Sequence, residues 1–219
     1  MTTKKGTISV LMAVHNTDFL LVKRAIDSVL AQTYKKFELI VLDDGSDNNT
    51  NNELLHYAQL YQHKITYLQH ENMGQSKSIN RGIENSKGEY ITILDADDEY
   101  KLNHLSTCLQ QMKQYDLIAS TTTTIVNNNE DYFVTDKHDI NKLVHVDDCI
   151  LFATLFGKRE VFSTLKFENK YAADAYFYER ADEHFLVTKV DLRTYIYYRN
   201  NPNSITAKMK QKNTSLYNN

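Results

Sequence analysis

The chain has few of the residues that interrupt regular structure. It contains one proline and six glycines in 219 residues, so few positions favour irregular linkers or breaks in helices and strands. A chain of this length can bury a substantial core and lies near the upper end for one domain. We therefore expect compact, regular structure.

Cysteines and long apolar runs are also scarce. Cys108 and Cys149 form no C-x-x-C pair, which argues against a zinc site or a disulfide framework and suits a reducing compartment. No apolar stretch approaches the length of a transmembrane helix. The segment after the basic N-terminus is too short and strand-like for a signal peptide. These features predict a cytoplasmic protein with no transmembrane segment.

The chain has no large excess of charge of either sign. Its 25 basic and 28 acidic residues give a net charge of −3, so we expect no nucleic-acid partner. The polar tail at 207–219 includes KMKQK (208–212), which we interpret as a solvated end. A basic segment of this kind leaves open a peripheral association with the inner face of a membrane.

The first half of the chain alternates between the hydrophobic periods of strands and helices. This alternation, with short connections, predicts βαβ units and a mostly parallel sheet covered by helices on both sides. The predicted strands are 7–14, 37–44, 65–69 and 89–94, and the predicted helices are 18–34 with Asp18 as N-cap, a helix through 54–61, and 76–86.

The second half of the chain is less regular and reads as α+β. A strand at 116–126 is followed by a polar turn and a shorter strand at 131–136. Residues 149–162 read as a strand running into a helix, 179–190 as a helix, and 192–200 as a last strand. We predict that this half packs on the first and contacts a second substrate.

Polar side chains follow three of the predicted strands. His15 and Asn16 follow the first strand, Asp43 and Asp44 end the second, and the acidic run 95–98 follows the fourth. Ligands of parallel α/β sheets bind beyond the carboxyl ends of the strands. The sequence therefore predicts a binding site at this edge.

The stretch EYITILDADDEY (89–100) ends a predicted strand with Asp95, Asp97 and Asp98. Carboxylates this close raise one another's pKa unless positive charge lies between them. Three carboxylates at a strand end are well placed to hold Mg²⁺ or Mn²⁺ against a diphosphate.

Three other kinds of site or turn also place several acids close together, as in the run 95–98. An EF-hand is excluded because Tyr100 and Ser106 stand where the calcium loop needs Gly and Glu. A phosphatase of the haloacid dehalogenase type also places D-x-D after a strand, but Glu99 stands where it normally has Thr or Val. A solvated acidic turn that caps a helix from Leu102 is the purely structural alternative.

Neither G-x-G-x-x-G after the first strand nor G-x-x-x-x-G-K-[ST] is present, so a dinucleotide fold and a P-loop are not supported. Four other segments occur in order: ISVLMAVHN, SVLAQTYKKFELIVLDDGSD, ENMGQSKSINRGIENSKGEYITILDADD and YERADEHFL. Together they resemble a GT-A glycosyltransferase of family 2. The resemblance runs from residue 8 to about 125, and more loosely to about 206.

The resemblance implies a Rossmann-like GT-A sheet with a smaller α+β acceptor-side half. It implies one domain over 1–219, with a nucleotide-sugar-binding half at about 1–115, an acceptor-side half at about 116–206, and the tail at 207–219. The implied activity is metal-dependent, inverting transfer of a hexosyl or N-acetylhexosaminyl group from a UDP-sugar to a hydroxyl of a cell-surface glycan or lipid-linked acceptor. The alternatives are the D-x-D phosphatase and a nucleotide-sugar-binding module without turnover.

The resemblance also implies which residues hold the nucleotide. His15 stands where many members stack an aromatic ring on uracil, with an ordinary loop histidine as the alternative. Asp44 is positioned to accept a hydrogen bond from the uracil imide, and a turn-forming role is the alternative, more so for Asp43. The full set is Ala13, His15, Asn16, Asp44, Gly74, Asn80, Asp95 and Ala96.

By the same resemblance Asp97 and Asp95 are the metal ligands, with Mn²⁺ or Mg²⁺ as the cofactor. Asp98 is a candidate contact of the donor sugar. Arg199 is a candidate phosphate contact. Lys77 is another, although an exposed helix lysine is the more common reading of that position.

An inverting transfer needs a base that takes the proton of the acceptor hydroxyl. The family places an acid at the start of a helix in the second half, where YERADEHFL offers Glu179, Asp182 and Glu183. We select Asp182, because it precedes the apolar residues expected on that helix. Glu183 is the alternative base.

Overall fold

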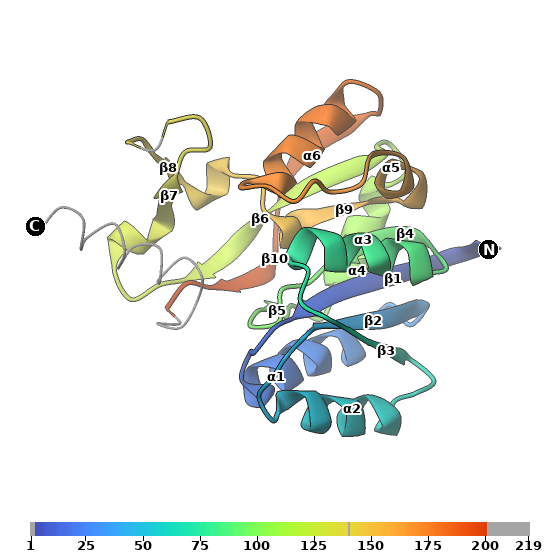
Figure 1. Ribbon diagram of the computed structural model, residues 1–219. Coiled ribbons are helices and arrows are strands. Elements are labelled where there is room, and N and C mark those ends of the chain that lie inside the picture. The colour runs from blue at the N-terminus through green and yellow to red at the C-terminus, as the bar shows by residue number, and fades with distance from the viewer. Residues whose placement is uncertain (1–2, 140, 201–219) are drawn as a thin grey trace, which may run out of the picture.

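The computed structural model describes residues 3–139 and 141–200 (Figure 1). Its main feature is an eight-stranded sheet with the order β3-β2-β1-β4-β9-β6-β10-β5. Only β9 and β5 run opposite to the other strands, so the prediction of a mostly parallel α/β sheet is confirmed. The strands are β1 (Lys4–Val14), β2 (Phe37–Asp44), β3 (Ile65–His70), β4 (Gly88–Ile93), β5 (Glu99–Tyr100), β6 (Leu117–Ile125), β9 (Leu155–Lys158) and β10 (Val187–Tyr198).

Helices cover both faces of the sheet (Figure 1). Apolar residues of α1, α2 and α4 belong to one buried cluster, and those of α3, α5 and α6 belong to a second cluster on the other face. The helices are α1 (Phe19–Leu30), α2 (Thr50–Leu60), α3 (Gln75–Asn85), α4 (His104–Gln111), α5 (Arg159–Leu165) and α6 (Ala173–Asp182).

The two buried clusters explain why the first strands are continuous apolar runs. In β1, Val10 and Met12 pack into the cluster under α1, while Leu11 between them packs into the cluster under α3. Side chains of a strand alternate between faces, so a strand covered on both faces needs apolar residues at every position. The apolar run of β1 ends at Val14, which is buried, and the next residue, His15, is exposed.

Local signals set the start of α1. The carboxylate of Asp18 accepts a hydrogen bond from the Leu20 amide at 2.8 Å, which confirms the predicted N-cap. The helix ends at Leu30, four residues earlier than predicted. Gln32 follows it as a fully buried residue whose side-chain amide donates to the carbonyls of Ser28 and Lys101.

The second half of the chain adds β6, β9 and β10 to the main sheet and also forms a small separate hairpin. The hairpin pairs β7 (Phe133–Thr135) with β8 (Leu143–His145), so the predicted strand at 131–136 is shorter than expected. Short 3₁₀ helices lie at Asn129–Tyr132 (η1), Val146–Asp148 (η2) and Phe152–Thr154 (η3). The predicted strand-to-helix segment at 149–162 is confirmed in order, as β9 followed by α5.

The predicted helix at 179–190 is wrong. Helix α6 ends at Asp182, and Val187 already pairs with Leu117 as the first residue of β10. The apolar residues taken as a helical stripe have different environments, because Phe185 packs on the core and Leu186 is 58% exposed. Pairing with β6 decides the conformation here.

No helix in the described part of the chain is long and apolar enough to cross a membrane. The predicted polar tail at 207–219, with its KMKQK segment, lies outside the described residues. The expected peripheral membrane association therefore remains a prediction.

Candidate active site

The residues after three parallel strands meet at one edge of the sheet, as predicted. Val14 at the end of β1 is level with Asp43 in β2, and the Leu94 amide after β4 binds the Leu11 carbonyl at 2.9 Å. The start of α3 joins the same edge, since the Gln75 side chain donates to Asp95 at 2.9 Å. We call residues 15–16, 43–44, 72–75 and 95–98 the rim.

Asp44 has a structural role at the rim. Its carboxylate is 3% exposed and accepts hydrogen bonds from the amides of Met73 at 2.7 Å and Gly74 at 3.0 Å. The His70 ring lies 3.4 Å from one of its oxygens. Gly45 follows with φ of +69°, and a Cβ there would lie 2.5 Å from the Asn72 amide nitrogen. Asp44 thus joins β2 to the segment before α3, whereas the local turn is formed by Asp43, whose carboxylate accepts the Ser46 amide at 2.9 Å.

His15 presents an exposed ring at the rim. One ring nitrogen lies 2.9 Å from the Asp44 carbonyl, and the Asn72 side chain lies 3.1 Å from the ring. Asn16 has a positive φ of 51°, and its side chain accepts a hydrogen bond from the Asp47 amide at 2.9 Å. These contacts fix the orientation of the His15 ring while leaving a ring face at the surface.

Asn80, predicted to contact the nucleotide, joins α3 to the segment before α6. Its amide nitrogen donates to the Phe167 carbonyl at 2.7 Å, and its oxygen accepts from the Phe167 amide at 2.9 Å. Both polar atoms are therefore engaged with the segment before α6. Among the other predicted contacts on this side, Lys77 is exposed on α3, Ala13 is half-buried and Ala96 is 7% exposed.

The acidic loop after β4 concentrates negative charge. Burial, followed by the nearby charges of Asp97 and Asp174, raises the pKa of Asp95 to about 7, and the hydrogen bond from Gln75 opposes part of this shift. A carboxyl group with such a pKa gains strongly from a cation, which removes the repulsion between the acids. The arrangement therefore favours cation binding.

Asp98, a predicted contact of the donor sugar, is buried in the protein. It is 1% exposed, and its carboxylate accepts the hydroxyl of Tyr195 at 2.5 Å and the amide of Tyr198 at 2.7 Å. Burial raises its pKa, as do the charges of Asp95 and Asp97. Asp98 thus ties the acidic loop to β10.

The carboxylates of the acidic loop suit a metal ion whose other coordination positions are filled by a bound substrate and by water. Among residues 3–139 and 141–200, no three His, Cys, Asp or Glu side chains are placed to hold a metal by themselves. Mg²⁺ takes only one or two carboxylates and completes its shell with waters and substrate phosphates, and hard oxygen donors also suit Mn²⁺. Asp95 and Asp97 match such a donor set.

The structure places Asp182 and Glu183 away from the rim. Asp182 is the exposed last residue of α6, and Glu183 follows it, also exposed. The chain then reaches Leu186, whose amide binds Asp116 at 2.9 Å just before β6 begins. That is the opposite edge of the sheet, because β6 runs parallel to β4. The expected position of Asp182 at the start of a helix is therefore wrong.

Asp174 occupies the position in which Asp182 was expected. It lies in the first turn of α6, and its carboxylate accepts the amides of Phe152 at 3.0 Å and Ala175 at 2.8 Å. Burial raises its pKa to about 6 although these bonds oppose the shift. Its charge contributes to the raised pKa of Asp95, so the two carboxyl groups lie in the same region of the protein.

Asp174 was not predicted as a site residue, although the segment ADAYFYERAD carries a signal for it. Phe177 and Ala181 are four residues apart and fully buried, which is the spacing of a helix that begins near residue 173. An acid at the start of that helix is Asp174. The third acid considered, Glu179, forms an ion pair with Lys137.

Arg199 is a buried cation at the end of β10. It is 8% exposed, and its guanidinium donates to the Phe133 carbonyl at 3.2 Å. Its Nε atom is buried without a hydrogen-bond partner among the described residues. An anionic ligand would supply the missing acceptor, which agrees with the predicted phosphate contact without testing it.

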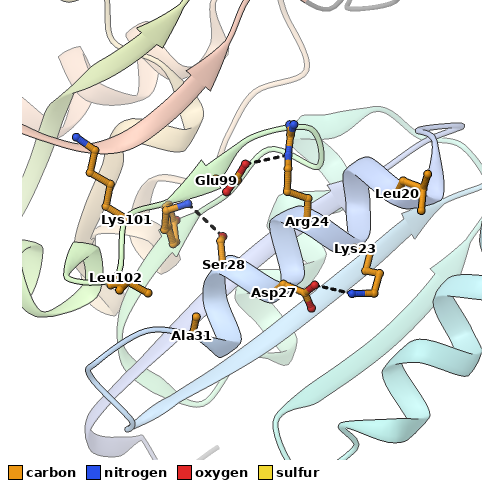
Figure 2. Close-up of a pocket in the computed structure, with 10 residues that line it drawn as sticks. Leu20, Lys23, Arg24, Asp27, Ser28, Ala31, Glu99, Lys101 and Leu102 are labelled. Atoms are coloured by element: carbon orange, nitrogen blue, oxygen red, sulfur yellow. Dashed lines mark hydrogen bonds and ion pairs between the residues drawn. The ribbon is translucent and has the colours of Figure 1, made fainter.

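A separate groove lies on the other face of the sheet, between α1 and residues 99–102 (Figure 2). Figure 2 shows its charges paired, with Arg24 on Glu99 and Lys23 on Asp27. The groove is lined by none of the rim carboxylates. Arg24 connects the groove to the rim, because its guanidinium donates a hydrogen bond to the backbone carbonyl of Asp97.

The model of the glycosyl transferase family 2 matches residues 9–183. The chain belongs to glycosyl transferase family 2. GlyG of Streptococcus pneumoniae serotype 4 is 34% identical over 147 residues, which cover 65% of this chain and 46% of GlyG. An uncharacterized glycosyltransferase of Rickettsia typhi is 33% identical over 183 residues, covering 75% of this chain and 56% of that protein.

Two solved structures share the fold of this chain. TarS 1-349 of S. aureus in complex with UDP-GlcNAc superposes with a TM-score of 0.70 at 18% identity, over 92% of this chain and 60% of that chain. The mannosyltransferase PcManGT of Pyrobaculum calidifontis, in complex with GDP-Man and Mn²⁺, superposes with a TM-score of 0.68 at 17% identity. The superposition covers 86% of this chain and 56% of that chain. The GT-A fold is thereby confirmed.

This chain spans only part of the curated relatives that it matches, from 15% of the length of GlyA of S. pneumoniae to 56% of the R. typhi protein. Activity, substrates and partners of the whole protein are therefore matters for proposal.

Proposed function

We propose that this family 2 domain is a metal-dependent, inverting glycosyltransferase that moves a hexosyl or N-acetylhexosaminyl group from a nucleotide sugar to a hydroxyl. One observation supports it above the others. The acidic loop and Asp174, from opposite halves of the chain, lie close enough together for the charge of Asp174 to raise the pKa of Asp95. A cation site and a candidate base thus share one edge.

Asp95 and Asp97 would hold the metal ion, Mn²⁺ or Mg²⁺, together with the donor diphosphate. When bound, the ion neutralises the charge that develops on the leaving diphosphate. Gln75 orients Asp95 through its hydrogen bond. Arg199, a buried cation with an unpaired Nε, supplies a further contact for a phosphate.

Asp174 would act as the base. It takes the proton of the acceptor hydroxyl as the oxygen attacks the anomeric carbon and the bond to the diphosphate breaks on the opposite face. The amides of Phe152 and Ala175 hold its carboxylate in place and leave lone pairs free, because a carboxylate has about four acceptor sites. A pKa raised to about 6 suits a group that must accept a proton near neutral pH.

The donor is proposed to be a UDP-sugar. The exposed His15 ring, fixed by Asp44 and Asn72, offers a face on which a base can stack. TarS 1-349 has been solved with UDP-GlcNAc, and PcManGT with GDP-Man, so both bases are compatible with the fold. The resemblance to uracil-stacking members favours UDP.

The acceptor is proposed to be a hydroxyl of a cell-surface glycan or a lipid-linked intermediate. Transfer would then take place in the cytoplasm, at the inner face of a membrane. The resemblance to family 2 is the support for this part of the proposal.

A donor screen tests the proposal. Several UDP- and GDP-sugars are incubated with the protein, with Mn²⁺ or with EDTA, and release of the nucleoside diphosphate is measured. We expect metal-dependent release from at least one UDP-sugar. Release of phosphate from simple monoesters would support the D-x-D phosphatase instead, and binding without release would support an inactive module.

The rate of transfer should depend on pH through Asp174. Its folded-state pKa is raised from 3.8 to about 6, and a base must be deprotonated to act. At saturating donor and Mn²⁺, kcat should therefore rise with pH up to about 6 and level off above it. A kcat that is constant from pH 5 to 8 would contradict this role.

A further inference from the structure

We propose that Arg24, Asp98, Tyr195 and Tyr198 form a clamp that positions Asp97 for metal binding. None of the four side chains is assigned a contact with metal or donor, so they are positioning residues. The inference rests on the proposed metal-dependent function of the rim. It adds four residues on which the metal affinity of the acidic loop depends: one on α1, one in the loop itself and two on β10.

One side of the clamp is the buried carboxylate of Asp98. It accepts the hydroxyl of Tyr195 at 2.5 Å and the amide of Tyr198 at 2.7 Å. These partners lie 97 and 100 residues further along the chain, on β10. Tyr195 is fully buried and stacks edge-on against Tyr100, so its hydroxyl has little freedom to move.

The other side of the clamp is Arg24 on α1. One nitrogen of its guanidinium donates to the Asp97 carbonyl at 2.5 Å, and its Nε lies 3.1 Å from Glu99 (Figure 2). The guanidinium also lies over the Tyr198 ring at 3.9 Å. Arg24 therefore contacts both the acidic loop and the end of β10.

The clamp fixes the backbone on both sides of the Asp97 side chain. Arg24 holds the carbonyl of Asp97, and Asp98, the next residue, is anchored to β10. The Asp98 amide also binds the Asp95 carbonyl at 3.2 Å, which closes the turn. An aspartate side chain has only two rotatable bonds, so a fixed backbone restricts its carboxylate to a few positions. Preorganised ligands bind metal more tightly than mobile ones.

A matched pair of tyrosine variants tests the clamp. Tyr195→Phe removes the hydroxyl that binds Asp98. Tyr100→Phe removes a neighbouring buried hydroxyl that binds the Ile93 carbonyl and Thr92 instead. Both tyrosines are at most 3% exposed, so the two changes should cost comparable thermal stability. Only the first should alter metal binding.

The readout is the affinity for Mn²⁺ in the presence of UDP, measured by electron paramagnetic resonance of free Mn²⁺, with metal-dependent donor hydrolysis as the second readout. Tyr195→Phe should weaken Mn²⁺ affinity by about 10- to 100-fold, the usual effect of losing an outer-shell partner. Saturating Mn²⁺ should restore most of kcat. Tyr100→Phe should bind Mn²⁺ as the wild type does.

Arg24→Lys provides a second test if Tyr195→Phe fails to fold. It keeps the positive charge but loses the planar guanidinium that contacts Asp97, Glu99 and Tyr198 together. Its Mn²⁺ affinity should fall in the same direction, whereas Lys23→Gln, one position away on α1, should leave it unchanged.

The outcomes separate the clamp from the proposed function. Equal Mn²⁺ affinity in Tyr195→Phe, Arg24→Lys and wild type would overturn the clamp while leaving the transferase proposal intact. A wild type that binds Mn²⁺ and UDP but hydrolyses no donor would overturn the proposed function. The Mn²⁺ affinities of the variants relative to the wild type would still test the clamp. A wild type that binds no Mn²⁺ would overturn both.

Discussion

Asp174→Asn should reduce sugar transfer by roughly 10²–10⁴-fold, the usual contribution of a positioned general base. The amide keeps the size of the side chain and can still accept hydrogen bonds from the backbone, so the fold should persist. The loss should appear in kcat, because the proton leaves the acceptor only as the new bond forms. Binding of Mn²⁺ and UDP should remain close to that of the wild type.

Two variants at the other end of α6 are the controls for this prediction. Asp182→Asn and Glu183→Gln change exposed acids at the opposite edge of the sheet, and both should keep near-normal transfer. Steady-state kinetics with one donor and one acceptor are sufficient for the comparison. A dead Asp182 variant together with an active Asp174 variant would show that the base was assigned to the wrong end of the helix.

Asp97→Asn should nearly abolish transfer, with a loss of at least about 10²-fold, since it removes part of the charge that stabilises the leaving group. An amide retains the shape of the carboxylate but not the charge that holds a divalent cation. Metal-dependent binding of UDP should weaken at the same time, while the melting temperature without metal should stay unchanged or rise, because repulsion with Asp95 is relieved.

Asp191→Asn is a control for a general effect of removing an acid. Asp191 is exposed on β10 and pairs with Arg193 and Thr121, so transfer and metal binding should be unaffected. If the Asp97 variant retained both properties, the acidic loop would be no more than a solvated turn.

The sequence was sufficient for the first half of the fold. Strand β2 was predicted with its observed bounds, and α3 within one residue, because residues buried on both faces of the sheet and a clear helical period leave little ambiguity. Chain direction then brought His15, Asp44 and Asp95 to one edge, since parallel strands share their carboxyl ends.

The sequence was insufficient where a residue's role depends on distant partners. Local sequence could not predict the hydrogen bonds that Asp98 accepts from Tyr195 and Tyr198. It could not predict those between Asn80 and Phe167, 87 residues away, either. The bounds of α6 were misplaced for a related reason. Whether residues 183–190 form a helix or a strand is decided by pairing with β6, which no local pattern reveals.

Titration calorimetry of UDP into the wild-type protein, once with Mn²⁺ and once with EDTA, tests the central claim most directly. The rim is proposed to bind a nucleoside diphosphate through a cation held by Asp95 and Asp97. We therefore predict clear binding with Mn²⁺ and a loss of most of it with EDTA, with the Asp97→Asn variant resembling the EDTA result. Equal binding of UDP with and without Mn²⁺, or no binding of either UDP or GDP, would contradict the account.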